Sequence, residues 1–153
     1  MKVESILVEV HVFKRTEDGI KFLLLKRNEK DSYGGVWQMV TGRIEENEKA
    51  FQTALREVKE ETGLNPIKLW SAPNVNSFYS AERDAILFIP VFIAEVDGKA
   101  SASVSFEHSE LKWVTSQEAR EMLIWKGQRS SVEIICEYLT KEGNTLNFNE
   151  IKI

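Results

Sequence analysis

Three glutamates near the middle of the chain have the type and spacing of a metal-binding surface. Glu57, Glu60 and Glu61 stand at positions i, i+3 and i+4. On a helix these positions share one face, with neighbouring Cβ atoms about 5–6 Å apart. Like charges so close together repel one another, and a cluster of hard oxygen ligands suits Mg²⁺ or Mn²⁺. The glutamates alone are also compatible with a solvated acidic helix face, for which Lys49 and Lys59 would be counter-ions.

The wider spacing decides between these two interpretations. Along residues 42–64 the chain has Gly42, then Glu48, then Arg56-Glu57-Val58, Glu60-Glu61 and Gly63-Leu64. This pattern resembles the Nudix box at every defined position. The resemblance implies an α/β fold, an α/β/α sandwich around a mixed β-sheet in which the box forms a loop–helix–loop motif.

The resemblance also implies a role for individual residues. Glu57, Glu60 and Glu61 correspond to the metal-binding carboxylates, and the backbone carbonyl of Thr41 to an additional ligand. The cofactor it implies is Mg²⁺ or Mn²⁺. A second group supports the motif, with Glu48 and Arg56 paired to hold the loop against the helix.

The general base that takes a proton from the attacking water has two candidates. Glu60 lies within the box, and Glu107 lies in the later segment SFEHSELKW. Family members differ over whether the base lies in the box or on a later loop. Glu107 is therefore predicted as a base or a further metal ligand, with an ordinary exposed loop acid as the alternative.

A second, shorter resemblance concerns the substrate. The stretch Trp37-Gln38-Met39-Val40-Thr41-Gly42, the segment Glu107-His108…Lys112-Trp113 and the region Trp125…Gln128-Arg129 are similar to dihydroneopterin triphosphate pyrophosphatases. This similarity implies release of pyrophosphate from a (deoxy)nucleoside triphosphate or a pterin triphosphate.

Three other activities remain open from the sequence. Diadenosine-polyphosphate hydrolases share a Trp before the box and a downstream Tyr, for which Tyr79 would serve, but they usually have Pro near Val40. ADP-ribose hydrolases tend to carry a proline in that same downstream region. They rank lower because Pro73 lies too early in the chain to be this proline. A nucleotide-binding regulator without catalysis is the third alternative, although such proteins usually lose part of the Arg-Glu…Glu-Glu set that is complete here.

Several residues outside the box are candidates for substrate binding. Arg27 at a strand end and Arg83 in a loop could meet phosphates, and ordinary solvated charge is the competing interpretation. Aromatic rings stack on bases, although core packing is their usual role. The candidates are Arg27, Trp37, Gln38, Tyr79, Arg83 and Trp125. His11 and His108 lack partners that would indicate zinc, so packing or exposure is expected for both.

The elements that must position these groups can be predicted from periodicity and turn signals. The box helix is expected over residues 48–62 with Asn47 as N-cap, and Gly63 suits the left-handed position after its end. The later helices are expected over 116–123, opened by a Thr115–Glu118 capping box, and over 127–139, with Cys136 buried. The predicted strands are 5–13, 20–25, 36–40, 67–70, 78–79, 85–96 and 110–114.

Length and composition set the outer limits. The chain has 153 residues, 42% of them hydrophobic and 29% charged, which predicts a single domain over residues 1–153. The net charge of −4 argues against a nucleic-acid polymer as partner and leaves a small phosphorylated substrate bound through cations. The absence of a long apolar run argues against a membrane span, and the single cysteine favours a cytoplasmic location. Family resemblance is compatible with a homodimer.

Overall fold

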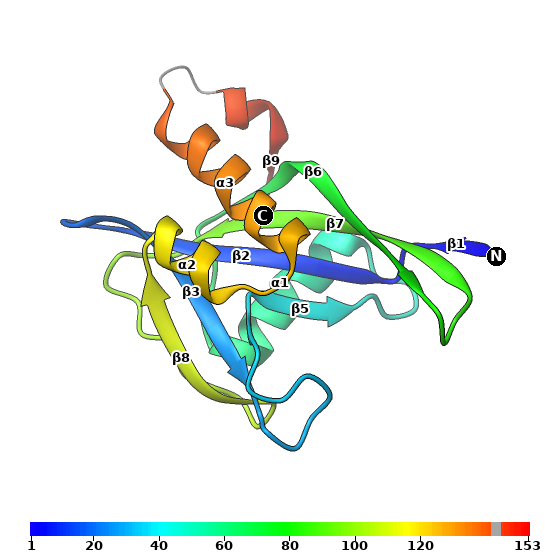
Figure 1. The fold of residues 1–153 in the computed structure, drawn as a ribbon. Coiled ribbons are helices and arrows are strands. Elements are labelled where there is room, and N and C mark those ends of the chain that lie inside the picture. Colours follow the sequence, from blue (N-terminus) through cyan, green and yellow to red (C-terminus); the bar gives the residue numbers. More distant parts are fainter. Residues whose placement is uncertain (142–144) are drawn as a thin grey trace.

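The computed structural model describes residues 1–141 and 145–153, and its centre is a mixed β-sheet (Figure 1). The sheet order is β4-β3-β2-β7-β6-β9, with β5 paired to β2, β8 to β3, and β1 to β7. Strand β2 runs parallel to β7 and antiparallel to β3 and β5. The bounds are β1 Lys2–Glu4, β2 Leu7–Thr16, β3 Gly19–Arg27, β4 Trp37–Gln38, β5 Val40–Arg43, β6 Lys68–Ser80, β7 Ala85–Glu95, β8 His108–Val114 and β9 Glu150–Ile151.

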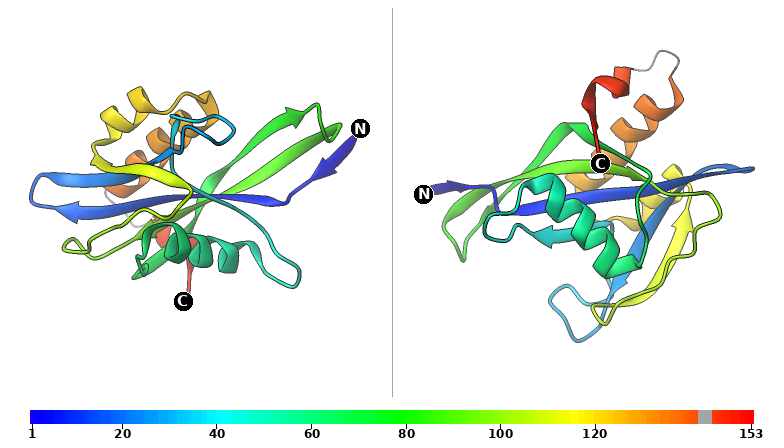
Figure 2. Two further views of the ribbon diagram at one scale, coloured as in Figure 1. Left: turned by 90° about the horizontal axis from the view of Figure 1, so that it is seen from below. Right: turned by 180° about the vertical axis from the view of Figure 1, so that it is seen from behind.

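Helices cover both faces of this sheet. Helix α1 (Ala50–Thr62) lies on one face, and α2 (Ser116–Met122) and α3 (Lys126–Thr140) lie on the other (Figure 2). A short 3-10 helix, Thr145–Asn149, leads into β9. Within the described residues, no helix has the length and apolar character needed to cross a membrane. The predicted α/β/α sandwich around a mixed sheet is confirmed.

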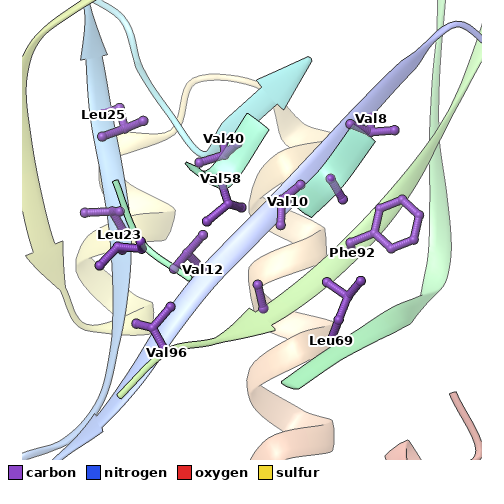
Figure 3. Packing of buried hydrophobic residues seen from close by; sticks show 13 residues of the cluster. Val8, Val10, Val12, Leu23, Leu25, Val40, Val58, Leu69, Phe92 and Val96 are labelled. Atoms are coloured by element: carbon purple, nitrogen blue, oxygen red, sulfur yellow. The ribbon is translucent and has the colours of Figure 1, made fainter. Parts of the chain in front are cut away.

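The alternation of side chains along β2 creates two hydrophobic cores. Successive strand residues point to opposite faces. Val8, Val10 and Val12 pack against Val58 of α1, as Figure 3 shows. Phe13 faces the other way and packs in the cluster that contains residues of α2 and α3. Helix α1 and the terminal helices are therefore fixed to the same strand from opposite sides.

The box helix begins later than predicted. Asn47 has φ 66°, the left-handed conformation that asparagine tolerates well, and Lys49 is the N-cap. A turn before the helix, in which the Glu48 carboxylate accepts a hydrogen bond from the Glu45 backbone N–H, occupies the predicted first residues. The prediction for the other end is confirmed, since Gly63 has φ 74° and donates its backbone N–H to the Lys59 carbonyl.

Strand β6 differs from the prediction because it is one long strand and not two short ones. Its register with β7 shifts between Ser71 and Val75, around Pro73. Proline has no N–H to give to a ladder and is found in sheets mainly at edges and bulges, so the sequence signal was interrupted there while the strand continues. Strand β7 is rich in apolar residues but is not buried throughout, since Phe88 is 44% exposed.

Three smaller differences concern the ends of elements. His108 was expected in a loop and is the first residue of β8. Strand β2 was expected over residues 5–13 and extends to Thr16. Cys136 was expected to be buried and is only partly so, because it lies at the edge of the apolar stripe of α3.

The packing of α1 gives a stability prediction. Val58 is fully buried between α1 and β2, so Val58→Asp would place an unpaired charge in the core. We expect this change to cost at least about 3 kcal/mol of unfolding free energy. The control Val58→Ala should cost roughly 2 kcal/mol. Urea unfolding measures both, and equal losses in the two variants would contradict this packing.

Candidate active site

Strand β5 and helix α1 approach each other very closely at Gly42. Gly42 lies in β5, paired with Val8 of β2. A Cβ atom built on Gly42 would lie 2.2 Å from Cγ of Glu57. No side chain fits there, so glycine allows the Glu57 carboxyl group to lie directly against the strand.

Arg56 holds this arrangement by contacting several acids at once. Its Nε donates to Glu48 Oε1 at 2.8 Å and its Nη2 to Glu48 Oε2 at 2.9 Å, a bidentate pair. Its Nη1 donates to Glu57 Oε1 at 2.8 Å and to Glu60 Oε2 at 3.2 Å. A further bond from Nη2 to the Arg43 carbonyl, at 3.0 Å, fastens the helix to β5. The Arg56 guanidinium lowers the pKa of Glu48 to about 2.

Glu61 is the most unusual carboxylate of the group. It is 2% exposed, and its Oε2 has no hydrogen-bond partner among residues 1–141 and 145–153. Burial, followed by the negative charges of Glu57 and Glu107, raises its pKa to about 9, although a backbone hydrogen bond from Thr41 acts in the opposite direction. The same burial raises the pKa of Glu57.

Glu107 and His108, from a much later segment of the chain, complete the cluster. One ligand atom from each of Glu61, Glu107 and His108 lies within 4.8 Å of the others. His108 is 4% exposed, and its Nδ1 has no hydrogen-bond partner in the part of the chain that the structure describes. Its Nε2 lies 3.1 Å from Nε2 of Gln38. Sequence reasoning missed His108, although its position next to Glu107 was a usable signal.

The predicted metal-binding carboxylates therefore divide into three that lie together and one that lies at the rim. Glu57, Glu61 and Glu107 gather beside the Thr41–Gly42 backbone. Glu60 has a side chain that is 59% exposed and paired with Arg56 at the rim. Glu61 is buried, Glu57 partly buried and Glu107 exposed, and together they fit a hard divalent cation because they supply oxygen donors. One of these donors, Glu61 Oε2, has no partner within the described residues.

The predicted substrate-binding residues are scattered. Gln38 is buried beside His108, and Trp37 is partly buried under the Lys112 ammonium group, 5.2 Å from the ring centre. Arg27 Nε donates to the Ser32 carbonyl at 2.8 Å. Arg83 is paired with Glu4 at 2.8 Å near the edge strand β1.

Tyr79 and Trp125 are brought together in one pocket. It has a volume of about 640 Å³ and lies between β6, the start of α3 and the segment around Tyr33. Glu9 of β2 also lines it. Glu9 is paired with Thr41 of β5 in the sheet, so the pocket and the carboxylate cluster adjoin the same two strands.

Comparison with known proteins agrees with this geometry. The NUDIX domain family model matches residues 6–137, so the chain belongs to the Nudix hydrolase family. It is 30% identical to dihydroneopterin triphosphate diphosphatase of Haemophilus influenzae, over 89% of this chain and 87% of that protein.

Three further proteins place the similarity in context. The chain is 31% identical over 82% of its length to an octanoyltransferase of Myxococcus xanthus, but it spans only 35% of that protein. Another relative, Nudix hydrolase 10 of Arabidopsis thaliana, is matched over 17% of its length. A crystal structure of a Listeria monocytogenes protein assigned as a NUDIX hydrolase superimposes with a TM-score of 0.78 at 27% identity, covering 98% of this chain and 100% of that one.

The pKa of Glu61 gives a prediction for the metal-free protein. The carboxyl group titrates near 4.5 when unfolded and at about 9 when folded, so the folded state retains its proton between these values. Unfolding free energy should therefore fall as pH rises through this window. Glu61→Gln, which stays neutral, should lose less stability than the wild type. Urea unfolding midpoints of the wild type and Glu61→Gln, measured in EDTA at both ends of this pH window, test the prediction. Equal losses of stability in the two proteins would contradict it.

Proposed function

We propose that this protein is a divalent-metal-dependent pyrophosphohydrolase, which uses water to cleave a phosphoanhydride bond in a small nucleotide-like substrate. The observation that carries the proposal is the buried Glu61 carboxylate, packed with Glu57 and Glu107 and lacking a cationic partner among the described residues. A polyphosphate would be repelled by this cluster unless cations lie between the two sets of charge.

The proposed roles follow from the geometry. Glu57, Glu61, Glu107 and the Thr41 carbonyl would hold Mg²⁺ or Mn²⁺. The bound ion would lower the pKa of a coordinated water and neutralise charge on the phosphate oxygens. Arg56, locked by Glu48, keeps Glu57 against Gly42.

Two acids remain the candidates for the general base that takes the proton from water. Glu107 is supported by its place in the cluster with Glu61 and His108. Glu60 lies at the rim, where its carboxylate accepts a hydrogen bond from Arg56. A carboxylate that acts as the general base would increase the rate roughly a hundredfold or more.

The substrate we favour is a (deoxy)nucleoside triphosphate or dihydroneopterin triphosphate, with release of pyrophosphate. The identity to the Haemophilus relative over most of both chains supports this choice. Hydrolysis of a diadenosine polyphosphate is the alternative. We also propose that residues 1–153 act as one domain, since strands near both chain ends, β1 and β9, pair with the central hairpin β6–β7.

A substrate panel tests the proposal. It contains nucleoside triphosphates, dihydroneopterin triphosphate, diadenosine tetraphosphate and ADP-ribose, each assayed with and without Mg²⁺ for release of phosphate or pyrophosphate. Turnover of at least one compound that requires Mg²⁺ is the expected result. A folded protein that binds nucleotides and cleaves none of them would instead be a regulator.

The role of Glu61 gives a first mutational prediction. Glu61→Gln should reduce kcat by at least roughly a hundredfold, because a ligand is lost while the side-chain volume is kept. Its circular dichroism spectrum should match that of the wild type. Glu46→Gln, which changes an exposed acid in the loop before α1, is the matched control and should keep its activity. Wild-type turnover by Glu61→Gln would refute the assignment.

The effect of Glu107 on activity can be distinguished from a general effect of removing one negative charge from the surface. Glu107→Gln should lower kcat by roughly a hundredfold or more if this residue is base or ligand. Glu110 lies three residues later and is paired with Lys26 at 3.1 Å, so Glu110→Gln removes the same charge outside the cluster. Steady-state kinetics should show a loss only in the first variant. If Glu107→Gln retains activity and Glu60→Gln does not, the base lies in the box.

A further inference from the structure

The pocket on the α3 side of the sheet contains an acid that the hydrolytic chemistry does not use. Glu9 lines this pocket and is 5% exposed. Its Oε2 accepts a hydrogen bond from Asn76 Nδ2 at 2.8 Å. Within the described part of the chain, no Lys, Arg or His forms an ion pair with it. Buried charges are normally paired, so a carboxylate held only by amide groups has capacity for further donors.

The amide beside Glu9 is fixed in place. Asn76 Nδ2 also lies 3.3 Å from Ser131 Oγ, and that hydroxyl group donates to the Gly127 carbonyl at 3.0 Å. A Cβ atom on Gly127 would lie 3.0 Å from Asn76 Oδ1, so glycine leaves room for this amide. The acceptor surface of Glu9 is therefore held rigidly by β6 and the start of α3.

Aromatic rings surround this acceptor. Trp125 is 49% exposed and contacts Tyr33 edge-to-face, with ring centres 5.8 Å apart. Phe78 lies two residues after Asn76 on β6, so both side chains point to the same face of the sheet. Phe78 is 47% exposed and also lines the pocket. Such partly exposed rings around a buried acceptor suit a flat heterocycle.

The position of Glu9 relates the pocket to the carboxylate cluster. Glu9 and Thr41 are directly opposite each other in adjacent strands, which places their Cα atoms about 4.5–5.5 Å apart. The Thr41 backbone in turn contacts Glu61. A ligand whose ring enters the pocket can thus extend its phosphates past β5 towards the cluster.

We propose that Glu9 determines substrate specificity by accepting hydrogen bonds from two adjacent N–H groups of a 2-amino-4-oxo-pyrimidine ring, the edge shared by guanine and pterins. This inference rests on the proposed function, because it treats the pocket as the ring site of the same substrate. Adenine presents a donor beside an acceptor on the corresponding edge, and its ring nitrogen would meet a carboxylate oxygen. Hypoxanthine keeps the ring N–H and lacks the amino group.

The protonation state of Glu9 is compatible with this role. Burial raises its pKa, and hydrogen bonds with Asn76 and Gln128 lower it. Two further N–H donors from a ligand would favour the ionised form in the same way as these amides do.

Binding without metal tests the proposal independently of catalysis. The probes are dGMP, dIMP and dAMP, titrated in EDTA and followed by calorimetry. Wild-type protein should bind dGMP roughly tenfold to a hundredfold more tightly than dIMP, because the missing amino group leaves a charged acceptor unpaired. It should discriminate against dAMP at least as strongly.

A matched substitution assigns the effect to Glu9. Glu9→Gln keeps the length of the side chain and replaces one acceptor by an NH₂ group, so dGMP should bind no better than dIMP. Glu17→Gln, an exposed acid in the β2–β3 turn, should keep the wild-type ratio. If Glu9→Gln does not fold, the ratio of the affinities of the wild-type protein for dGMP and dIMP still tests the proposal.

Equal binding of dGMP and dIMP, a preference for dAMP, or a dGMP preference that survives in Glu9→Gln would each overturn the proposal. A silent hydrolysis panel together with the expected binding ratio would contradict the proposed function and leave the role of Glu9 intact.

Discussion

The cost of burying the charge of Glu61 is the constraint on which the site depends. An isolated carboxylate loses its hydration when it is buried, and two neighbouring acids increase the penalty. Here the response of the metal-free protein is a pKa raised to about 9, so that Glu61 is neutral at physiological pH. A divalent cation would compensate the charge directly. Binding of such an ion would therefore be coupled to deprotonation of Glu61.

The surrounding structure serves to keep these acids together despite their repulsion. Gly42 provides the space for Glu57, and the Arg56–Glu48 pair fixes the side of the helix that faces β5. Val58 anchors the same helix in the hydrophobic core one residue after Glu57. Positioning by a buried apolar residue and a bidentate ion pair is rigid, so little reorganisation is needed when charge develops on a substrate.

The sequence predicted the parts of the fold and of the site that follow from local spacing. The face shared by Glu57 and Glu61, the left-handed Gly63 and the capping box at Thr115 depend on residues within one or two turns. His108 and Glu9 were not predicted as site residues, because their neighbours come from distant strands. His108 meets Gln38 across 70 residues, and Glu9 meets Asn76 across 67. Such contacts depend on sheet register, which a single sequence does not specify.

The most direct measurement of the central claim is a titration of the protein with Mn²⁺, followed by electron paramagnetic resonance of the free ion. Wild-type protein should bind Mn²⁺ saturably, more tightly as pH rises, and in competition with Mg²⁺. Glu61→Gln should bind it at least roughly tenfold more weakly. Equal affinity in the two proteins, or no saturable binding to the wild type, would show that the buried carboxylate is not a metal ligand.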